Sequence, residues 1–322
     1  MGIVEKKMNR KSIILSIKGL KLSKEEYSLI QNEKPWGIIL FKRNIKNINQ
    51  LKSLTSKIKK AMNDSLYPIL IDEEGGRVSR LSNIFDTKKF AQYFFGNLFE
   101  KNKRIGENIY KEYLYLICKI LNNTGININT IPVLDILKNK THKIIGDRSY
   151  SKNLKTIKSL GRICINILNN YKIGSVSKHI PGHGCSNLDT HNNRAVVYDS
   201  YNDLLKNDFN AFKKIKSHFV MTAHIVYKKI DPLNVATHSE IVIKNIIRKK
   251  LTYKGLILSD DISMKALSKN LLFNAKKAIQ SGCNLALYCG GDIKESRILL
   301  KGMKKIDDFT AKKTSEFYKF LR

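Results

Sequence analysis

The sequence lacks the features that would place the chain in a membrane or in a disulfide-linked, secreted class. No apolar run reaches the ~18–20 residues that a membrane-spanning helix needs. The first residues, MGIVEKKMNRKS, are polar and lack the apolar stretch of a secretory signal. The five cysteines form no CxxC pair and their number is odd, which favours reduced thiols. We therefore expect a cytoplasmic protein that does not insert into a membrane.

Negative charge is also scarce, because 27 acidic residues stand against 59 basic ones and the formal net charge is +32. Only 11 of the basic residues are arginine, and the lysines are spread along the whole chain. Proteins that read nucleic acids favour arginine with interleaved aromatic residues. The abundance of lysine, asparagine and isoleucine indicates a general compositional bias instead. We expect no nucleic-acid partner, although the charge is also suited to attracting an anionic substrate.

What the sequence does contain is a regular alternation of short apolar runs and longer amphipathic segments. The strand-like runs lie at 37–41, 68–72, 128–135, 174–178, 218–222, 255–259 and 284–288. Segments with apolar residues at helical spacings lie at 46–62, 103–122, 154–171, 201–216, 240–251 and 264–281. This alternation predicts a parallel sheet covered by helices. With an eighth strand unassigned, it fits a single (β/α)8 TIM barrel over residues 1–322, and a doubly wound open sheet is the alternative.

Polar residues follow several of the predicted strands. They are Asp72, Asp135, Lys178 with His179, His224, and Asp260 with Asp261. In a (β/α)8 barrel the carboxyl ends of the strands and the loops after them build the active site. One such residue alone is more often a turn residue or a helix N-cap. Because all of these would converge on one mouth, the pattern favours the barrel.

Three of the seven histidines lie within one loop, SKHIPGHGCSNLDTH, at residues 177–191. One hypothesis is a metal site made of His179, His183, Asp189 and His191. A proline and a glycine between the first two histidines break the helix that such a pair needs, so we expect no metal. A second hypothesis is a dyad in which Asp189 orients His191 for proton transfer near neutral pH. A surface loop with incidental polar residues is the third.

Three further stretches carry residues suited to binding or attacking a sugar. GLILSDDISM, at 255–264, delivers two carboxylates to the end of an apolar strand. Such a carboxylate either attacks an anomeric carbon or caps the next helix. IDEEGGRVSR, at 71–80, combines carboxylates and arginines with two glycines that permit a sharp turn. GDRS, at 146–149, is either part of the same site or an ordinary β-turn.

These motifs occur together in an order that resembles glycoside hydrolase family 3. Within that family they are most similar to the bacterial cytoplasmic β-N-acetylhexosaminidases of cell-wall recycling. The stretches that carry the resemblance are IDEEGGRVSR, IIGDRSYS, SKHIPGHGCSNLDTH, VMTAHI and GLILSDDISMKAL, and they span about residues 36–290. The resemblance implies a TIM barrel, in agreement with the alternation of strands and helices.

The resemblance also implies roles for individual residues. Asp260 matches the catalytic nucleophile, His191 the general acid/base and Asp189 its partner, whereas His183 is expected to shape the loop. The matches to sugar-binding positions are Asp72, Arg80, Arg148, Lys178 and His179. The departures at Glu73, Ile180 and Thr190, where the family usually has glutamine, an aromatic residue and serine, are mild for the chemistry.

The function implied is that of an exo-acting, retaining β-N-acetylglucosaminidase without a cofactor. Its partner would be a small carbohydrate substrate of the GlcNAc-anhydroMurNAc type, and we expect a monomer. An N-acetylglucosaminide phosphorylase is one alternative function. A non-catalytic barrel that binds carbohydrate or nucleic acid is the other.

Overall fold

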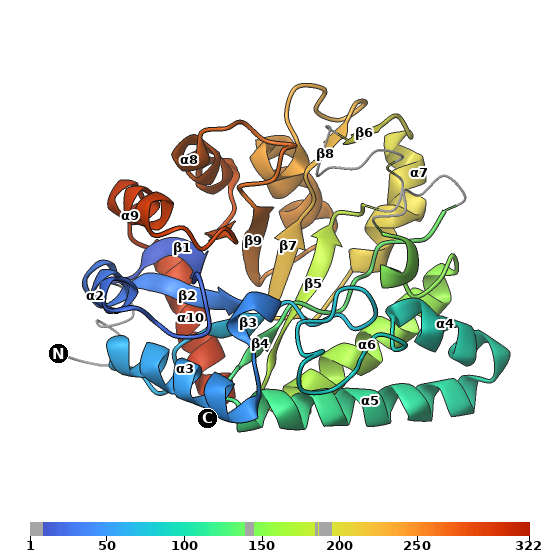
Figure 1. Cartoon of the computed structure of the whole chain (residues 1–322). Helices are drawn as coiled ribbons and strands as arrows, with labels where there is room; N and C mark the ends of the chain where they lie inside the picture. The colour runs from blue at the N-terminus through green and yellow to red at the C-terminus, as the bar shows by residue number, and fades with distance from the viewer. Residues whose placement is uncertain (1–8, 139–144, 184–185, 187–194) are drawn as a thin grey trace.

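The computed structural model describes residues 9–138, 145–183, 186 and 195–322, and its central feature is a closed barrel of parallel strands (Figure 1). Around the barrel the strands follow the order β1-β10-β9-β7-β5-β4-β3-β2. Their bounds are β1 (Lys11–Ser16), β2 (Pro35–Leu40), β3 (Ile69–Ile71), β4 (Ile128–Asn129), β5 (Gly174–Ile180), β7 (Phe219–Thr222), β9 (Leu256–Asp261) and β10 (Leu285–Tyr288). The closed barrel confirms the predicted TIM fold and excludes the open sheet. Two further strands, β6 (Ala195–Val197) and β8 (Ile225–Tyr227), pair only with each other.

Helices surround the barrel (Figure 1). The α-helices are α2 (Lys24–Glu33), α3 (Ile48–Ala61), α4 (Gln92–Lys101), α5 (Lys103–Asn123), α6 (Leu154–Asn170), α7 (Tyr201–Lys206), α8 (Leu271–Ser281), α9 (Ile293–Gly302) and α10 (Asp308–Leu321). Shorter 3-10 segments are η1 (Lys42–Asn44), η2 (Gly146–Arg148), η3 (Asp208–Phe212) and η4 (Ala236–His238), and η5 (Ile241–Lys250) is a π-helix. No helix in the described part of the chain is both long and apolar enough to cross a membrane.

Local sequence signals set the ends of many helices. Ser23 and Glu26 form a capping box at the start of α2, and Asn47 accepts a hydrogen bond from the backbone of Gln50 at the start of α3. Gly282 ends α8 with a φ of 112°, a backbone conformation that favours glycine. Such caps explain why α3, α5 and α6 begin within two residues of the predicted positions.

Four segments were either left unassigned or predicted differently from the sequence. The eighth strand is β1, whose apolar stretch was hidden beside the polar N-terminal residues. The run at 128–135 forms a regular strand only at β4, although backbone groups of Ile131, Pro132 and Leu134 still form hydrogen bonds with β5. The helix predicted at 201–216 is divided into the short α-helix α7 and the 3-10 segment η3. The helix predicted at 264–281 starts only at Leu271, as α8.

One end of the barrel is closed by the last helix, α10. Inward-facing side chains of the strands form a single apolar cluster that includes Phe317 and Tyr318 of this helix. Trp36 at the start of β2 donates a hydrogen bond from Nε1 to the Thr314 hydroxyl at 2.9 Å. Because these contacts seal the end where the strands begin, the polar residues at the strands' carboxyl ends face the opposite, open end.

Candidate active site

The carboxyl ends of the strands enclose a cavity of about 550 Å³. The charged and imidazole-bearing residues that line it are Asp72, Arg77, Arg80, Arg148, Lys178, His179, His183, Asp260, Asp261 and Lys265. Asp72 follows β3, whereas Lys178 and Asp260 belong to β5 and β9. Several of the strand ends singled out from the sequence therefore do converge. Asp135 and His224 do not line the cavity but are buried behind it.

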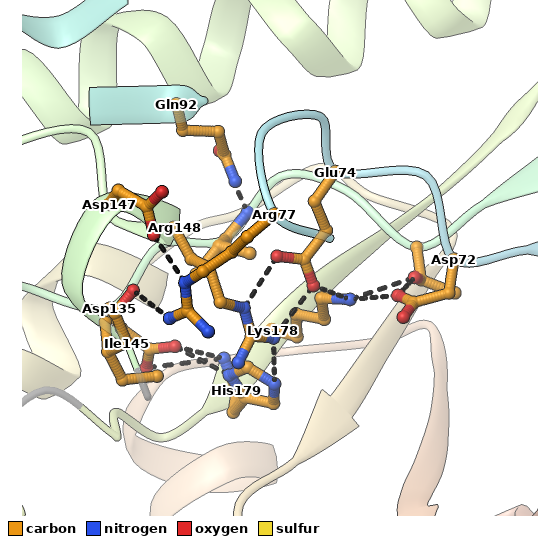
Figure 2. Close-up of polar contacts among 12 residues, drawn as sticks. Asp72, Glu74, Arg77, Gln92, Asp135, Ile145, Asp147, Arg148, Lys178 and His179 are labelled. Carbon is orange, nitrogen blue, oxygen red and sulfur yellow. Dashed lines mark hydrogen bonds and ion pairs between the residues drawn. The ribbon is translucent and has the colours of Figure 1, made fainter. Parts of the chain in front are cut away.

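Asp72 is held between two cations. Its Oδ1 lies 2.5 Å from Nζ of Lys178, and its Oδ2 lies 2.6 Å from Nη2 of Arg80 (Figure 2 shows the lysine contact). The Thr130 hydroxyl donates to Oδ1 as well. Burial raises the pKa of Asp72, but Lys178 and Arg80 outweigh burial and lower it below the usual value. The carboxylate is thus ionised at neutral pH and can accept hydrogen bonds from a ligand's hydroxyl groups.

Glu74 extends this network to Arg148 (Figure 2). Two guanidinium nitrogens of Arg148 donate to the Glu74 carboxylate at 2.7 and 2.8 Å, and Nζ of Lys178 lies 2.5 Å from Oε1. Burial raises the pKa of Glu74, but Arg148 and Lys178 lower it overall. The ion pairs with Asp72 and Glu74 offset the cost of burying Lys178, since an unpaired buried charge would cost several kcal/mol.

His179 is oriented by a buried carboxylate, Asp135 (Figure 2). Nδ1 of His179 lies 2.7 Å from Oδ2 of Asp135, and Nε2 lies 3.3 Å from Nη2 of Arg148. Because a guanidinium only donates hydrogen bonds, Nε2 must accept this one, which leaves the proton on Nδ1. The backbone N–H of His183 also donates to Asp135, at 2.5 Å. His179 is therefore arranged to bind rather than to donate a proton from Nε2.

The two carboxylates at the end of β9 have different surroundings. Asp261 accepts hydrogen bonds from the backbone and hydroxyl of Ser263 and from the backbone N–H of Cys289, so it organises the turn. Asp260 accepts only from the backbone N–H of Asp261, at 2.8 Å, among the hydrogen bonds of the described residues. Burial raises the pKa of Asp260, but interactions that include His179 and His224 lower it overall. Asp260 is thus an ionised carboxylate at the cavity wall.

The glycine-rich turn after β3 is closed by another carboxylate, Glu73. Its Oε2 accepts hydrogen bonds from the backbone N–H groups of Arg80 and Leu81, at 2.6 and 2.8 Å. Arg77 in the same turn pairs with Asp147 of η2 at 2.6 Å. The turn therefore brings Arg80 to the cavity and connects the 71–80 and 146–149 motifs, so the latter is more than an ordinary β-turn.

Asp189 and His191, the predicted dyad, lie outside the described residues. His183, from the same loop, is buried at the cavity, and burial lowers its pKa to about 4. Within the residues that the structure describes, no three histidine, cysteine or acidic side chains form a metal-binding group. The four-residue metal hypothesis includes the two residues outside this range.

Sequence reasoning missed the carboxylates that support the site. The motif of Glu74 predicts no individual role for it, and Asp135 is predicted only as a residue at a strand end. For Glu74 the signal was a third carboxylate within the acidic run before two glycines. For Asp135 no local signal pointed to His179, which lies 44 positions further along the chain.

Comparison with known proteins places these motifs in a wider context. The profile of the glycosyl hydrolase family 3 N-terminal domain matches residues 4–314. A β-hexosaminidase of Psychromonas ingrahamii is 33% identical over 287 residues, which cover 86% of this chain and 82% of that protein. One of Nitrosomonas eutropha is 30% identical over 282 residues, covering 86% and 80%. The solved structure of NagZ from Neisseria gonorrhoeae with N-trifluoroacetyl-D-glucosamine is similar with a TM-score of 0.86 and 28% identity, over 98% of this chain and 90% of that one.

Proposed function

The chain belongs to glycoside hydrolase family 3, and we propose that it is an exo-acting, retaining β-N-acetylglucosaminidase that removes terminal N-acetylglucosamine from cell-wall muropeptide fragments. The observation that carries the proposal is the ionised Asp260 carboxylate beside the cations and hydrogen-bond acceptors of one sugar-sized cavity. The relatives named as β-hexosaminidases and the NagZ complex with a glucosamine derivative support it.

The proposed reaction has two steps. A carboxylate oxygen of Asp260 attacks C1 of the sugar, and the bond from C1 to the leaving oxygen breaks while His191 protonates that oxygen. His191 then takes a proton from water, whose oxygen attacks C1 and releases Asp260. Two displacements retain the configuration at C1. Asp189 orients His191 and stabilises its charged form.

The residues around Asp260 hold the sugar in this proposal. Asp72 accepts hydrogen bonds from hydroxyl groups, while Arg80, Arg148 and Lys178 donate them. The ion pairs with Asp72 and Glu74 fix these cations before a ligand arrives. Groups fixed in advance need no reorganisation as positive charge develops on the sugar ring in the transition state. We further propose that residues 1–322 act as one domain, as a cytoplasmic monomer, without a cofactor or nucleic-acid partner.

The test is chemical labelling of the intermediate. We expect wild-type protein to release p-nitrophenol from p-nitrophenyl N-acetyl-β-glucosaminide. An activated fluoro sugar that slows the second step should inactivate the protein, and peptide mapping should find the label on Asp260. Turnover with a label on a different carboxylate would contradict the assignment of Asp260, and absence of turnover would contradict the activity.

Phosphorolysis is the second candidate, and the cations of the cavity, including Arg77, Arg80 and Arg148, favour it because they would attract phosphate. Rates measured with and without phosphate decide between the two. Hydrolysis yields free N-acetylglucosamine at a rate that phosphate does not raise. Phosphorolysis yields the sugar 1-phosphate and needs phosphate in the second step.

A further inference from the structure

The motif VMTAHI ends in a histidine to which the proposed function gives no role. His224 follows β7 and is only 1% exposed. Its Nε2 lies 3.0 Å from the backbone carbonyl oxygen of Asp261. A carbonyl oxygen only accepts hydrogen bonds, so Nε2 carries a proton and donates it. The imidazole thus binds the peptide group between Asp261 and Ile262, one peptide group beyond the one that follows Asp260.

The other ring nitrogen is fixed as well. Nδ1 of His224 lies 2.7 Å from the hydroxyl oxygen of Thr237, in η4. That hydroxyl lies 3.1 Å from the carbonyl oxygen of Ala223 and 2.8 Å from the hydroxyl of Thr222. Both threonines are fully buried. Because both nitrogens have partners on separate elements, the ring has one orientation between β7, η4 and β9.

The end of β9 is held on its other side by β10 and the residue after it. The backbone N–H of Ile262 donates to the carbonyl oxygen of Leu287 at 2.9 Å, and that of Cys289 donates to the Asp261 carboxylate at 3.1 Å. His224 provides the opposing contact from the β7 side. The direction in which Asp260 points therefore depends on a peptide segment held from two sides.

We propose that His224 is a positioning residue for the reaction, because its Nε2–H group holds the Asp261 carbonyl so that the Asp260 carboxylate faces the cavity. The inference rests on the proposed function, since it concerns catalysis only if Asp260 attacks the sugar. A misplacement of about 1 Å at a reacting group can cost about 100-fold in rate. The position of one peptide plane is therefore sufficient to affect turnover.

His224 also acts on the charge of Asp260. It is among the groups that keep the pKa of Asp260 low against the effect of burial, which raises it. Among the described residues, the titratable and charged groups that interact with Asp260 from the surrounding elements include Lys178, His179, His183, His224, Asp261 and Cys289. Removing His224 from this set should make Asp260 easier to protonate.

The experiment compares His224→Leu, which removes the donor, with His224→Gln, whose side-chain amide can donate to the same carbonyl. His218→Gln is the matched control, because His218 precedes the opposite end of β7 and packs on Phe317 and Phe320 of α10. The readouts are kcat and KM for p-nitrophenyl N-acetyl-β-glucosaminide, the pH profile of kcat/KM, and thermal unfolding.

We expect His224→Leu to lower kcat by about 100-fold with little change in KM. The acidic limb of its kcat/KM profile should move to higher pH, because Asp260 loses a group that favours its charged form. His224→Gln should recover much of kcat, because its side-chain amide can donate to the same carbonyl oxygen. His218→Gln should retain the kinetics of the wild type.

Several outcomes would overturn the inference. One is a His224→Leu protein with wild-type kcat and acidic limb. Another is a His224→Gln protein whose kcat is no higher than that of His224→Leu, if the loss of kcat in both variants is explained by their loss of folded protein. If His224→Leu does not fold, Thr237→Val is the second variant, because it removes the hydroxyl that fixes Nδ1 of His224. We expect folded Thr237→Val protein to have a lower kcat, and a wild-type kcat in this variant would refute the inference. Labelling keeps the two hypotheses apart: wild-type protein labelled on Asp260 leaves the proposed function standing whatever His224 does, whereas a label elsewhere overturns both.

Discussion

Oδ2 of Asp135 lies 2.7 Å from Nδ1 of His179, although the two residues come from different parts of the barrel wall. The carboxylate is fully buried, and the backbone N–H groups of His179 and His183 donate to it as well. One side chain thus fixes the ring of a cavity-lining histidine and the start of the loop that follows β5.

Replacing this carboxylate tests its structural contribution. We expect Asp135→Ala to lower the free energy of unfolding by about 3 kcal/mol, because buried N–H groups that lose a partner cost about 1–3 kcal/mol each. KM should rise too, since His179 loses its orientation. Urea unfolding and steady-state kinetics measure both effects. Ser200→Ala, which removes a helix-capping side chain on α7, is the control for a small, local loss. Unchanged stability in Asp135→Ala would contradict this account.

Stability should fall as the pH falls from about 6.5 to about 4. Burial lowers the pKa of His183 to about 4 and that of His218 likewise to about 4, below the ordinary value of 6.5. Between these limits the unfolded chain binds more protons than the folded one, so stability rises with pH. Each histidine contributes a slope of at most about 1.4 kcal/mol per pH unit. Urea unfolding across this range should give a shallower dependence in His183→Gln and in His218→Gln, and an unchanged slope would argue against burial as the cause.

Asp260→Ala should abolish turnover, because no other group is proposed to form the bond to C1. Purified protein is assayed with p-nitrophenyl N-acetyl-β-glucosaminide, and circular dichroism checks that the barrel is intact. Asp261→Asn serves as the neighbouring control, since the Asp261 side chain faces Ser263 and Cys289. We expect this variant to retain measurable activity. Full activity in Asp260→Ala would remove the proposed mechanism.

His191→Ala should lower turnover by ~10²–10⁴-fold, the usual range for general acid–base catalysis. The loss should be smallest for substrates with good leaving groups, because these need little protonation in the first step. A series of aryl N-acetyl-β-glucosaminides of increasing leaving-group pKa measures the dependence. An equal loss for every leaving group would show that His191 is not the acid.

A chelator should leave the activity unchanged, because no step of the proposed reaction uses a metal ion. The protein is dialysed against EDTA and assayed beside an undialysed sample. Activity that is lost and then restored by zinc would instead support the metal site considered for His179, His183, Asp189 and His191.

Much of this architecture could be predicted from the chain itself. The buried strands β2, β5, β7, β9 and β10 are short apolar runs with turn signals, and α3, α5 and α6 have clear helical spacing and caps. Such signals are local, so a window of several residues contains them. β1 was not predicted because its short apolar run lies directly beside the polar N-terminal residues, although it pairs with β10 to close the barrel.

The sequence by itself determined the alternation that closes into a barrel, and it determined which motifs end its strands. Only the tertiary structure decided that Glu74 joins Lys178 to Arg148, that Asp135 orients His179, and that His224 donates a hydrogen bond to the carbonyl oxygen of Asp261. A strand can be predicted from neighbouring residues, because the faces to which its side chains point are set by their order along the chain. Pairing between charges on different strands depends instead on how the barrel closes, and closure brings together residues that are far apart in the chain.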